Sequence, residues 1–367
     1  MHWVCPERTP YHDFFFGELS GDPDVILTVH YLNAYLDIHP WEDLGVARYR
    51  SRICSRSAWI DWSLVRLALC RYNKFVIAGW HTPSLIILLL TLVLLHRNFV
   101  IWTDTPAVQH YRSPLKAYFR RVFLKLVFLN ASRVMSTGEP GVEALQQMGC
   151  PKQKTVVFPF FVRLDSTRAS DSAKKSDQCV RFVSSGRLVN RLKGYDLALR
   201  AIAQAKNSVG DRHFEYHIAG AGVDEKELKK LALDLGVSDQ THFRGWLGPQ
   251  AMLQLLLDAD IFVHPALDDP FPVAVLEAMA AGAVVLGSDA CGSVRDRIKH
   301  GVNGFIHAAG NIQELADQVA YLLRHPEVMK DIGTLARRTA EEWPASRGIS
   351  IIKSLFSNNS STNRGVH

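Results

Sequence analysis

Residues 261–283, IFVHPALDDPFPVAVLEAMAAGA, place a short apolar run, a loop and a helix-forming stretch in direct succession. The run 261–263 has the length and composition of a fully buried strand. Pro272 can open the helix, because its fixed φ and missing N–H are tolerated at a helix start, and Gly282 supplies a left-handed cap at the end. The apolar run 284–286 follows as the next strand. This order predicts a parallel α/β unit.

The loop 265–271 lies at the carboxyl end of the expected strand, where parallel α/β sheets bind their ligands. Unpaired N–H groups at the start of the next helix favour an anion there. Two carboxylates flank the turn. Asp269 precedes the helix, and Glu277 shares a helical face with Val273, four positions earlier. Either both carboxylates contact a ligand, or Asp269 caps the helix and Glu277 is a solvated charge.

Composition limits the class of protein. With 367 residues, of which 47% are hydrophobic and 21% charged, the chain is long enough for two domains and is neither disordered nor fibrous. The six cysteines show no CxxC pair, so we expect reduced thiols in a cytoplasmic protein. We expect no secretory leader and no membrane span, because the longest apolar run, 85–95, is about half a span. All of the net charge of +6 arises in residues 1–163.

Two series of short apolar runs, separated by helix-like segments, predict two doubly wound α/β domains. The first series is 25–29, 75–78, 99–102, 133–135 and 155–158. The second series is 181–184, 216–219, 242–243, 261–263, 284–286 and 304–306. We therefore expect an N-terminal domain over residues 1–163, a C-terminal domain over 164–345, and a last helix with a disordered tail over 346–367.

The stretch SSGRLVNRLKGYDLALRA, residues 184–201, sets Arg187 just after an expected strand and Lys193 ahead of a helix. A sugar nucleotide leaves as a nucleoside diphosphate, and the charge that develops on this group must be neutralised. An arginine fork and a lysine point charge suit that task. The alternative for both residues is ordinary surface pairing.

Two further segments end expected strands with glycine. Gly220 and Gly222 either allow close approach of a ligand or form a plain tight turn. In HFRGWL, residues 242–247, backbone groups near Arg244, Trp246 and Leu247 could meet a flat base.

In this order the segments resemble the nucleotide-binding half of the GT4 family of retaining glycosyltransferases, which have the GT-B fold. The matching elements are GRLxxxxKGxD at 186–196, the GAG turn at 220–222, FxG at 243–245, ADIFVHP at 259–265, the acidic pair ahead of EAMAAG, and GxNGF at 301–305. Together they cover residues 180 to about 325, and six motifs in register are specific.

The resemblance implies an α/β protein of the GT-B fold, with two Rossmann-like domains and a cleft between them. It implies a metal-independent hexosyltransferase that moves a sugar from a nucleoside diphosphate sugar to an acceptor hydroxyl with retention, in polysaccharide or glycolipid synthesis. No cofactor is implied.

The family's residue roles transfer to positions of this chain that match the motifs. Gly186, Arg187 and Lys193 would hold the diphosphate, and Glu277 would bind the ribose. Backbone N–H groups near Phe271, Pro272 and Val273 would face phosphate. Asp269 replaces the family's first glutamate and shortens that arm by one methylene, so we expect it to alter the contact with the donor sugar.

The first half resembles the family only loosely, because no glycine-rich loop follows the first strand before Gly17. Asp104 in WTDTP stands where the family often has a histidine, and His81, after the run 75–78, is another candidate for the cleft. Each of His81, Asp104 and His110 is either a site group or a structural polar group.

Asp258 and Asp260 form a DxD sequence between an expected helix and strand. Capping and turn formation are the roles expected there, so no metal site is predicted.

Residues 111–128, YRSPLKAYFRRVFLKLVF, predict a basic amphipathic helix with Leu115, Phe119, Val122 and Leu126 on one face. Such a helix could lie on an anionic bilayer at the inner face of the cell membrane and serve a lipid-linked or glycan acceptor. The alternative is a domain helix with snorkelling basic side chains. No nucleic-acid motif accompanies the charge. Rival functions are a nucleotide-sugar epimerase or hydrolase, and a catalytically silent subunit that binds nucleotide sugar.

Overall fold

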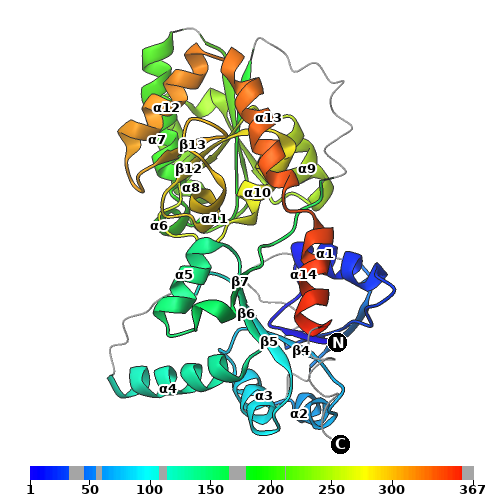
Figure 1. The fold of residues 1–367 in the computed structure, drawn as a ribbon. Coiled ribbons are helices and arrows are strands. Elements are labelled where there is room, and N and C mark those ends of the chain that lie inside the picture. The colour runs from blue at the N-terminus through cyan, green and yellow to red at the C-terminus, as the bar shows by residue number, and fades with distance from the viewer. Residues whose placement is uncertain (33–44, 55–59, 107–113, 165–178, 211, 358–367) are drawn as a thin grey trace, which may run out of the picture. The chain divides into compact units, whose positions relative to one another are not determined.

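The computed structural model describes residues 1–32, 45–54, 60–106, 114–164, 179–210 and 212–357. The chain divides into two compact units (Figure 1), one of Met1–Phe161 with Ala345–His367 and one of Val162–Pro344. The chain passes from the first unit to the second after Phe161, two residues before the boundary expected at 163. The last helix belongs to the first unit, whereas the sequence analysis set residues 346–367 apart.

The first unit contains a parallel sheet whose strand order is β3-β2-β1-β4-β5-β6-β7. This is the doubly wound arrangement of a Rossmann-like domain. The strands are β1 His2–Cys5, β2 Thr28–Tyr31, β3 Arg50–Ile53, β4 Phe75–Ala78, β5 Phe99–Thr103, β6 Arg133–Ser136 and β7 Thr155–Val157. Fully buried β4 and β5 carry unbroken apolar runs, as strands covered on both faces require.

The strand expected at 25–29 begins later, at Thr28. The residues just before Thr28 form a turn that Asp22 stabilises. The carbonyl oxygen of Asp22 accepts from Val25 N at 3.1 Å, and its carboxylate accepts from Asp24 N at 3.0 Å. Ile26 is consequently exposed. The apolar side chain of Ile26 therefore led to a predicted strand start that is too early, although Ile26 lies outside the sheet.

Helices flank the first sheet on both faces (Figure 1). They are α1 Pro10–Gly21, α2 Trp62–Leu69, α3 Pro83–Leu94, α4 Pro114–Asn130, α5 Glu139–Gln147 and α14 Ala345–Ser357, with a 3-10 turn at Lys152–Lys154. Gly348 lets α14 approach the unit closely, because a Cβ there would lie 2.4 Å from Phe161 Cζ and 2.7 Å from Phe15 Cε2. Lys353 Nζ also binds the carboxylates of Asp22, at 3.0 Å, and Asp24, at 2.6 Å. These contacts fix α14 to the first unit.

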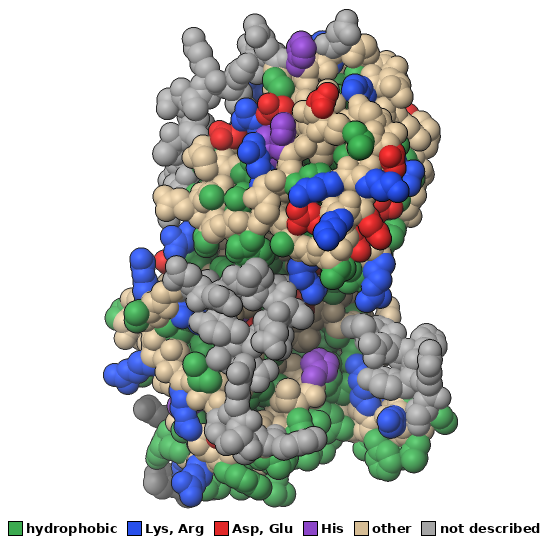
Figure 2. All heavy atoms as spheres, turned by 180° about the vertical axis from the view of Figure 1, so that it is seen from behind, with side chains coloured by type: hydrophobic (Ala, Val, Ile, Leu, Met, Phe, Trp, Pro, Cys, Tyr) green, Lys and Arg blue, Asp and Glu red, His purple; other side chains and the backbone are tan. Residues whose placement is uncertain are grey.

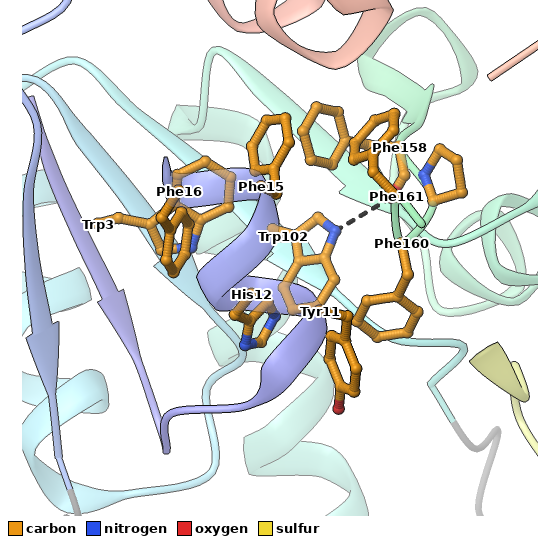
Figure 3. Close-up of a pocket in the computed structure, with 10 residues that line it drawn as sticks. Trp3, Tyr11, His12, Phe15, Phe16, Trp102, Phe158, Phe160 and Phe161 are labelled. Atoms are coloured by element: carbon orange, nitrogen blue, oxygen red, sulfur yellow. Dashed lines mark hydrogen bonds between the residues drawn. The ribbon is translucent and has the colours of Figure 1, made fainter. Parts of the chain in front are cut away.

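Aromatic side chains enclose a small pocket inside the first unit (Figure 3). Trp102 from β5 stands between α1 and the chain after β7, and its Nε1 donates to the carbonyl oxygen of Phe158 at 3.1 Å. His12 of α1 lies among these rings, 5.3 Å from Trp102 between ring centroids. Burial lowers the pKa of His12 to about 4, so the imidazole is neutral at pH 7. The residues that line the pocket come from β1, α1, β5 and the segment that follows β7.

The second unit repeats the same topology, with strand order β10-β9-β8-β11-β12-β13 and every pair parallel. Its strands are β8 Val180–Ser185, β9 Phe214–Ala219, β10 Thr241–Gly245, β11 Ile261–His264, β12 Val284–Ser288 and β13 Phe305–His307. The two parallel-sheet units confirm the expected pair of Rossmann-like domains.

Helices cover both faces of the second sheet. They are α6 Asn190–Lys193, α7 Tyr195–Val209, α8 Glu225–Asp234, α9 Pro249–Leu257, α10 Val273–Ala281, α11 Gly292–Arg297, α12 Ile312–Arg324 and α13 Glu327–Glu341, with a 3-10 turn at Ser238–Gln240. One core lies among α7, α8 and α12, and another lies among α9, α10 and α13.

The α10 helix spans Val273–Ala281, and Pro272 precedes it instead of occupying its first helical position. Pro272 is the N-cap residue, with an extended ψ of 115°, and Val273 is the first helical residue. Gly282 ends the helix in the left-handed conformation with φ 81°, as expected. Among the described residues, no helix is long and apolar enough to cross a membrane.

Candidate active site

The carboxyl ends of three neighbouring strands in the second unit are tied together by backbone hydrogen bonds. Gly186 N donates to Ala219 O at 3.0 Å, and Gly220 N donates to Gly245 O at 2.7 Å. Leu188 N donates to Ala221 O at 3.0 Å in the same way. The segments that follow β8, β9 and β10 therefore form one continuous edge, which is where a doubly wound sheet binds ligands.

Positions 220 and 222 require glycine, because the neighbouring backbone leaves no room for a Cβ. A Cβ on Gly220 would lie 1.9 Å from Gly186 O, and one on Gly222 would lie 2.3 Å from Leu188 O. Gly220 also has φ 141°, which L side chains rarely adopt. The close approach that the sequence predicted is made by the neighbouring strand end, and ligand contact by the two glycines stays a prediction.

Lys193 and Asp269 meet beside this edge. Lys193 Nζ donates to Asp269 Oδ2, and the two side chains are 19% and 9% exposed. The loop after β11 is tied to the end of α6, because Leu267 N and Asp268 N donate to Leu192 O at 2.8 and 3.2 Å. The structure thus brings together two residues, 76 positions apart, that the sequence selected separately.

His264, the last residue of β11, contacts the same carboxylate. Its Nε2 lies 2.9 Å from Asp269 Oδ2. Burial acts to raise the pKa of Asp269, but the hydrogen bond from His264 and the charge of Lys193 lower it overall. Asp269 is therefore an ionised carboxylate. It does not cap α10, because the N-cap residue of that helix is Pro272 and no side chain makes a cap hydrogen bond there.

Arg187 follows β8 and is half buried. Among the described residues, no carboxylate or carbonyl accepts a hydrogen bond from its guanidinium. A half-buried cation at the carboxyl edge of a sheet is suited to an anionic ligand. Phe271, Pro272 and Val273 lead into α10, whose first N–H groups lack intrahelical partners. Pro272 has no N–H, so the donors in this segment are its neighbours.

Glu277 lies in the second turn of α10 and is exposed. Within the described part of the chain, no donor reaches its carboxyl group. Although solvent reaches the residue, the protein around the carboxyl group raises its pKa to about 7 by desolvation. Glu277 therefore takes up a proton more readily than a fully solvated glutamate.

The end of β10 and the segment after it present Arg244, Trp246 and Leu247, of which Arg244 and Trp246 are exposed. Arg244 Nε donates to His217 Nδ1 at 2.9 Å, and His217 Nε2 lies 3.0 Å from Glu215 Oε2. The arginine side chain is thus held against β9. This leaves the backbone near Trp246 as the feature predicted to meet a base.

Asp104 and His81 lie in the first unit, after the adjacent strands β5 and β4. Asp104 Oδ1 accepts hydrogen bonds from Thr105 N at 2.7 Å and from Thr137 Oγ1 at 2.9 Å, so it stabilises the turn after β5. The side chain of His81 is exposed to solvent. Partial desolvation of its ring, followed by the charge of Arg120, lowers its pKa. Their catalytic role stays a prediction, and His110 lies outside the described residues.

The DxD sequence is occupied by structural contacts. Asp258 is the C-cap of α9, and Asp260 Oδ2 accepts from Arg181 N at 2.9 Å. Over the described ranges, no group of three or more His, Cys, Asp or Glu side chains is arranged to hold a metal ion.

Sequence reasoning missed His264 as a partner of Asp269 and His217 as a partner of Arg244. The one available signal was the histidine at the end of the strand in ADIFVHP, since a polar residue at that position points to the ligand edge.

Comparison with known proteins gives a matching family model and two curated relatives. Residues 165–339 match the family model described as glycosyl transferases group 1. The amylovoran biosynthesis glycosyltransferase AmsK of Erwinia amylovora is 32% identical over 194 residues, which is 50% of this chain and 45% of AmsK. The putative colanic acid biosynthesis glycosyltransferase WcaL of Salmonella typhimurium is 28% identical over 63% of this chain and 55% of WcaL. The chain spans about half the length of these curated relatives.

The crystal structure of Anabaena HepE in complex with UDP and glucose resembles the whole chain. Its TM-score is 0.73 at 16% identity, covering 97% of this chain and 99% of that one. At this identity the likeness establishes the fold, which is GT-B.

Proposed function

From residues 165–339, which belong to the group 1 glycosyl transferases, we infer that this protein transfers a sugar from a nucleoside diphosphate sugar to an acceptor hydroxyl with retention. The observation that carries the proposal is the placing of Arg187 and the Lys193–Asp269 pair at the carboxyl edge of the second sheet. The relatives named for amylovoran and colanic acid biosynthesis support a glycan or lipid-linked glycan as the acceptor. Both of these relatives are named as transferases, so neither an epimerase, a hydrolase nor a silent subunit is adopted.

In the proposed reaction, the bond between the anomeric carbon and the diphosphate oxygen breaks, and a bond to the acceptor oxygen forms on the same face. The departing phosphate oxygen takes the acceptor's proton. The charge that builds up on the diphosphate is met by Arg187, by the two remaining protons of the Lys193 ammonium, and by N–H groups at the start of α10. In this proposal the ribose hydroxyls are bound by Glu277, whose pKa is raised to about 7 and whose carboxyl group has no donor among the described residues.

We further propose that this charge set acts without a divalent ion. Arg187 supplies a permanent cation, and Asp258 and Asp260 are engaged in the α9 cap and the β8 backbone. A metal that bridged the diphosphate would need carboxylates free to coordinate it.

The acceptor side of the proposal concerns α4. Its exposed apolar side chains recur at helical spacing, and its opposite face is buried in the first unit through Leu124, Val127 and Phe128. The exposed residues are Leu115, Tyr118, Phe119, Val122, Leu126 and Leu129. Figure 2 shows hydrophobic side chains next to Lys and Arg side chains over the lower part of the picture, where the first unit lies. Residues 111–113 of the predicted helix lie outside the described residues.

We propose that this face of α4 rests on an anionic bilayer at the inner face of the cell membrane. Exposed Lys116, Arg121 and Lys125 adjoin the apolar stripe, and α4 has no acidic residue. An apolar stripe bordered by cations fits the boundary between acyl chains and anionic headgroups. Exposure of the stripe supports this choice over the alternative of a domain helix with snorkelling basic side chains.

The experiment for the transfer function uses binding and turnover together. A thermal-shift screen against UDP, GDP, ADP and their sugars should reveal one base, because a ligand that binds only the folded state stabilises it by about 2.7 kcal/mol at 100 times its Kd. Lys193→Ala should then slow transfer from that donor by about 100-fold while leaving circular dichroism unchanged. Exposed Lys330 of α13 offers a matched control, since Lys330→Ala should leave activity unchanged. Lys193→Ala activity within about twofold of the parent would contradict the assignment.

A further inference from the structure

The buried imidazole at the end of β11 has no place in the reaction as proposed. His264 is 4% exposed, and its ring stacks on Phe262 of the same strand, with 6.1 Å between centroids and 11° between planes. Its Nε2 lies 2.9 Å from Asp269 Oδ2. A buried histidine directed at a carboxylate in a ligand site does more than fill space, because an apolar side chain would pack there without a polar group to satisfy.

The proton on this imidazole can be placed from its partner. An ionised carboxylate only accepts hydrogen bonds, so Nε2 must carry the hydrogen that lies between His264 and Asp269. Lys193 Nζ donates to the same oxygen. Two donors therefore hold Oδ2, and no donor among the described residues reaches Oδ1.

The backbone of Asp269 is fixed as firmly as its side chain. Gly292 N donates to Asp269 O at 3.1 Å, and the two residues before Asp269 are tied to Leu192 O. With the backbone and one carboxylate oxygen held, the position of the free oxygen of Asp269 is fixed as well.

We infer that His264 is a positioning residue, which holds Asp269 so that its free oxygen binds a hydroxyl of the donor's sugar. This inference rests on the proposed function and adds a selectivity element to it. The short aspartate and the histidine form a matched pair. A glutamate at 269 would carry the carboxylate about 1.5 Å further along its arm, away from a partner that cannot follow because it is packed on β11.

The pair can be tested through the difference between sugar and nucleotide binding. His264→Leu removes the donor of the hydrogen bond and keeps an apolar side chain of similar size. We expect kcat/KM for the nucleotide sugar to fall by about 10- to 100-fold, as for loss of a hydrogen bond to a charged group. Binding of the nucleoside diphosphate alone should stay within about twofold, because that part of the donor contacts other residues.

Two further variants separate positioning from folding. His264→Gln keeps an N–H near the position of Nε2 and should retain kcat/KM within about fivefold of the parent. Asp269→Glu should lose activity in the parent background, and the double variant His264→Leu with Asp269→Glu should be more active than Asp269→Glu alone. Such non-additivity is expected for side chains in contact and is not expected from two independent losses of stability.

The outcomes are distinct. If His264→Leu matches the parent in kcat/KM, or if the two substitutions act additively, the positioning role is wrong while the transfer function stands. If His264→Leu does not fold, the glutamine variant decides, since a loss equal to that of Asp269→Ala would contradict the inference. A parent that transfers no sugar from any donor in the panel would instead overturn the proposed function.

Discussion

Arg187 and Lys193 are the two cations that the proposed reaction needs, and they differ in what they contact. Lys193 Nζ already binds Asp269, whereas the Arg187 guanidinium has no acceptor among the described residues. An incoming diphosphate can therefore bind Arg187 without breaking a protein contact. At Lys193 the diphosphate of the proposed complex would share the ammonium with Asp269, and the donor's sugar would then lie next to that carboxylate.

If these residues supply the positive charge, transfer should not need a divalent ion. We expect activity in excess EDTA to remain within about twofold of the untreated value, while Arg187→Ala lowers kcat/KM by about 100-fold. Both are measured in the same transfer assay. Activity that EDTA abolishes and that Mg²⁺ or Mn²⁺ restores would show that the metal-independent proposal is wrong.

Gly220 shows how one missing side chain determines the shape of the site. A Cβ there would lie 1.9 Å from Gly186 O, and the φ of 141° strains any L residue. We expect Gly220→Ala to lower the free energy of unfolding by about 3 kcal/mol. Gly17 in α1 is the control, because a Cβ there meets nothing within 4 Å. Gly17→Ala should be neutral or stabilising by about 0.5–1 kcal/mol, which urea denaturation can measure. Equal effects of the two substitutions would contradict this explanation.

The residues of the site could be selected from sequence because each lies in a segment that joins an expected strand to the next long helix. Arg187, Lys193 and Asp269 were found in this way, and the structure brings the last two into contact. Their partners could not be found. His264 reaches Asp269 only because the intervening loop folds back, and Gly220 needs glycine because β8 and β9 are neighbours. Both facts depend on strand order and loop path, which local sequence does not encode.

At the scale of elements, apolar runs located buried strands such as β4 and β5, but the predicted series omitted the buried strand β1 and the edge strand β3 of the first sheet. The strand β3 has the sequence RSRI, and all four residues are exposed, so it carries no hydrophobic pattern. It pairs with β2 through its backbone. The last helix, α14, was assigned to a separate tail because its contacts with α1 join residues more than 300 positions apart, such as Lys353 and Asp22. Backbone pairing and long-range packing were the two features that periodicity could not reveal.

Helix α4 gives a prediction that belongs to a whole element. The protein should sediment with phosphatidylcholine vesicles that contain phosphatidylglycerol, and the double variant Phe119→Ser with Val122→Ser should bind them at least about tenfold more weakly. Arg121→Ser and Lys125→Ser should each weaken binding by about fivefold, because a basic residue near an anionic surface is worth about 1 kcal/mol. Vesicle sedimentation measures all of these.

The control for α4 uses exposed apolar residues of the second unit. Val223 and Leu233 are 84% and 65% exposed, so Val223→Ser with Leu233→Ser removes similar apolar surface at another place. That variant should bind vesicles like the parent. Equal losses in both double variants, or binding that does not depend on phosphatidylglycerol, would contradict a specific bilayer contact by α4.

At the scale of the molecule, sequence and structure agree on two doubly wound parallel sheets. The agreement follows from buried strands such as β4, β5, β11 and β12, whose apolar runs have no other stable place in a folded chain. Both units also bury histidines, in a strand or in a helix that packs on the sheet. His12 and His30 lie in the first unit and His307 in the second, and burial lowers the pKa of each to about 4.

These histidines predict that the protein loses stability in mild acid. A histidine whose pKa is near 6.5 when unfolded and about 4 when folded binds its proton first in the unfolded chain. Its contribution is fully present above pH 6.5 and is lost as the pH falls toward 4, by up to about 3 kcal/mol for each group. Glu277 acts in the opposite direction between its ordinary pKa and about 7, but its exposure to solvent keeps that effect small.

Substitution of one buried histidine should therefore make the free energy of unfolding depend less steeply on pH in mild acid. His307 is 2% exposed, and its burial and nearby His264 lower its pKa. The carboxylates of Glu314 and Asp289 raise that pKa and offset the lowering only in part. With His307→Gln, the slope of unfolding free energy against pH between about 4.5 and 6 should fall by about 1.4 kcal/mol per pH unit. Exposed His213 is the control, and His213→Gln should leave the slope unchanged. Urea denaturation at a series of pH values measures both slopes, and a His307→Gln slope equal to the parent's would show that His307 is not neutral in the folded protein.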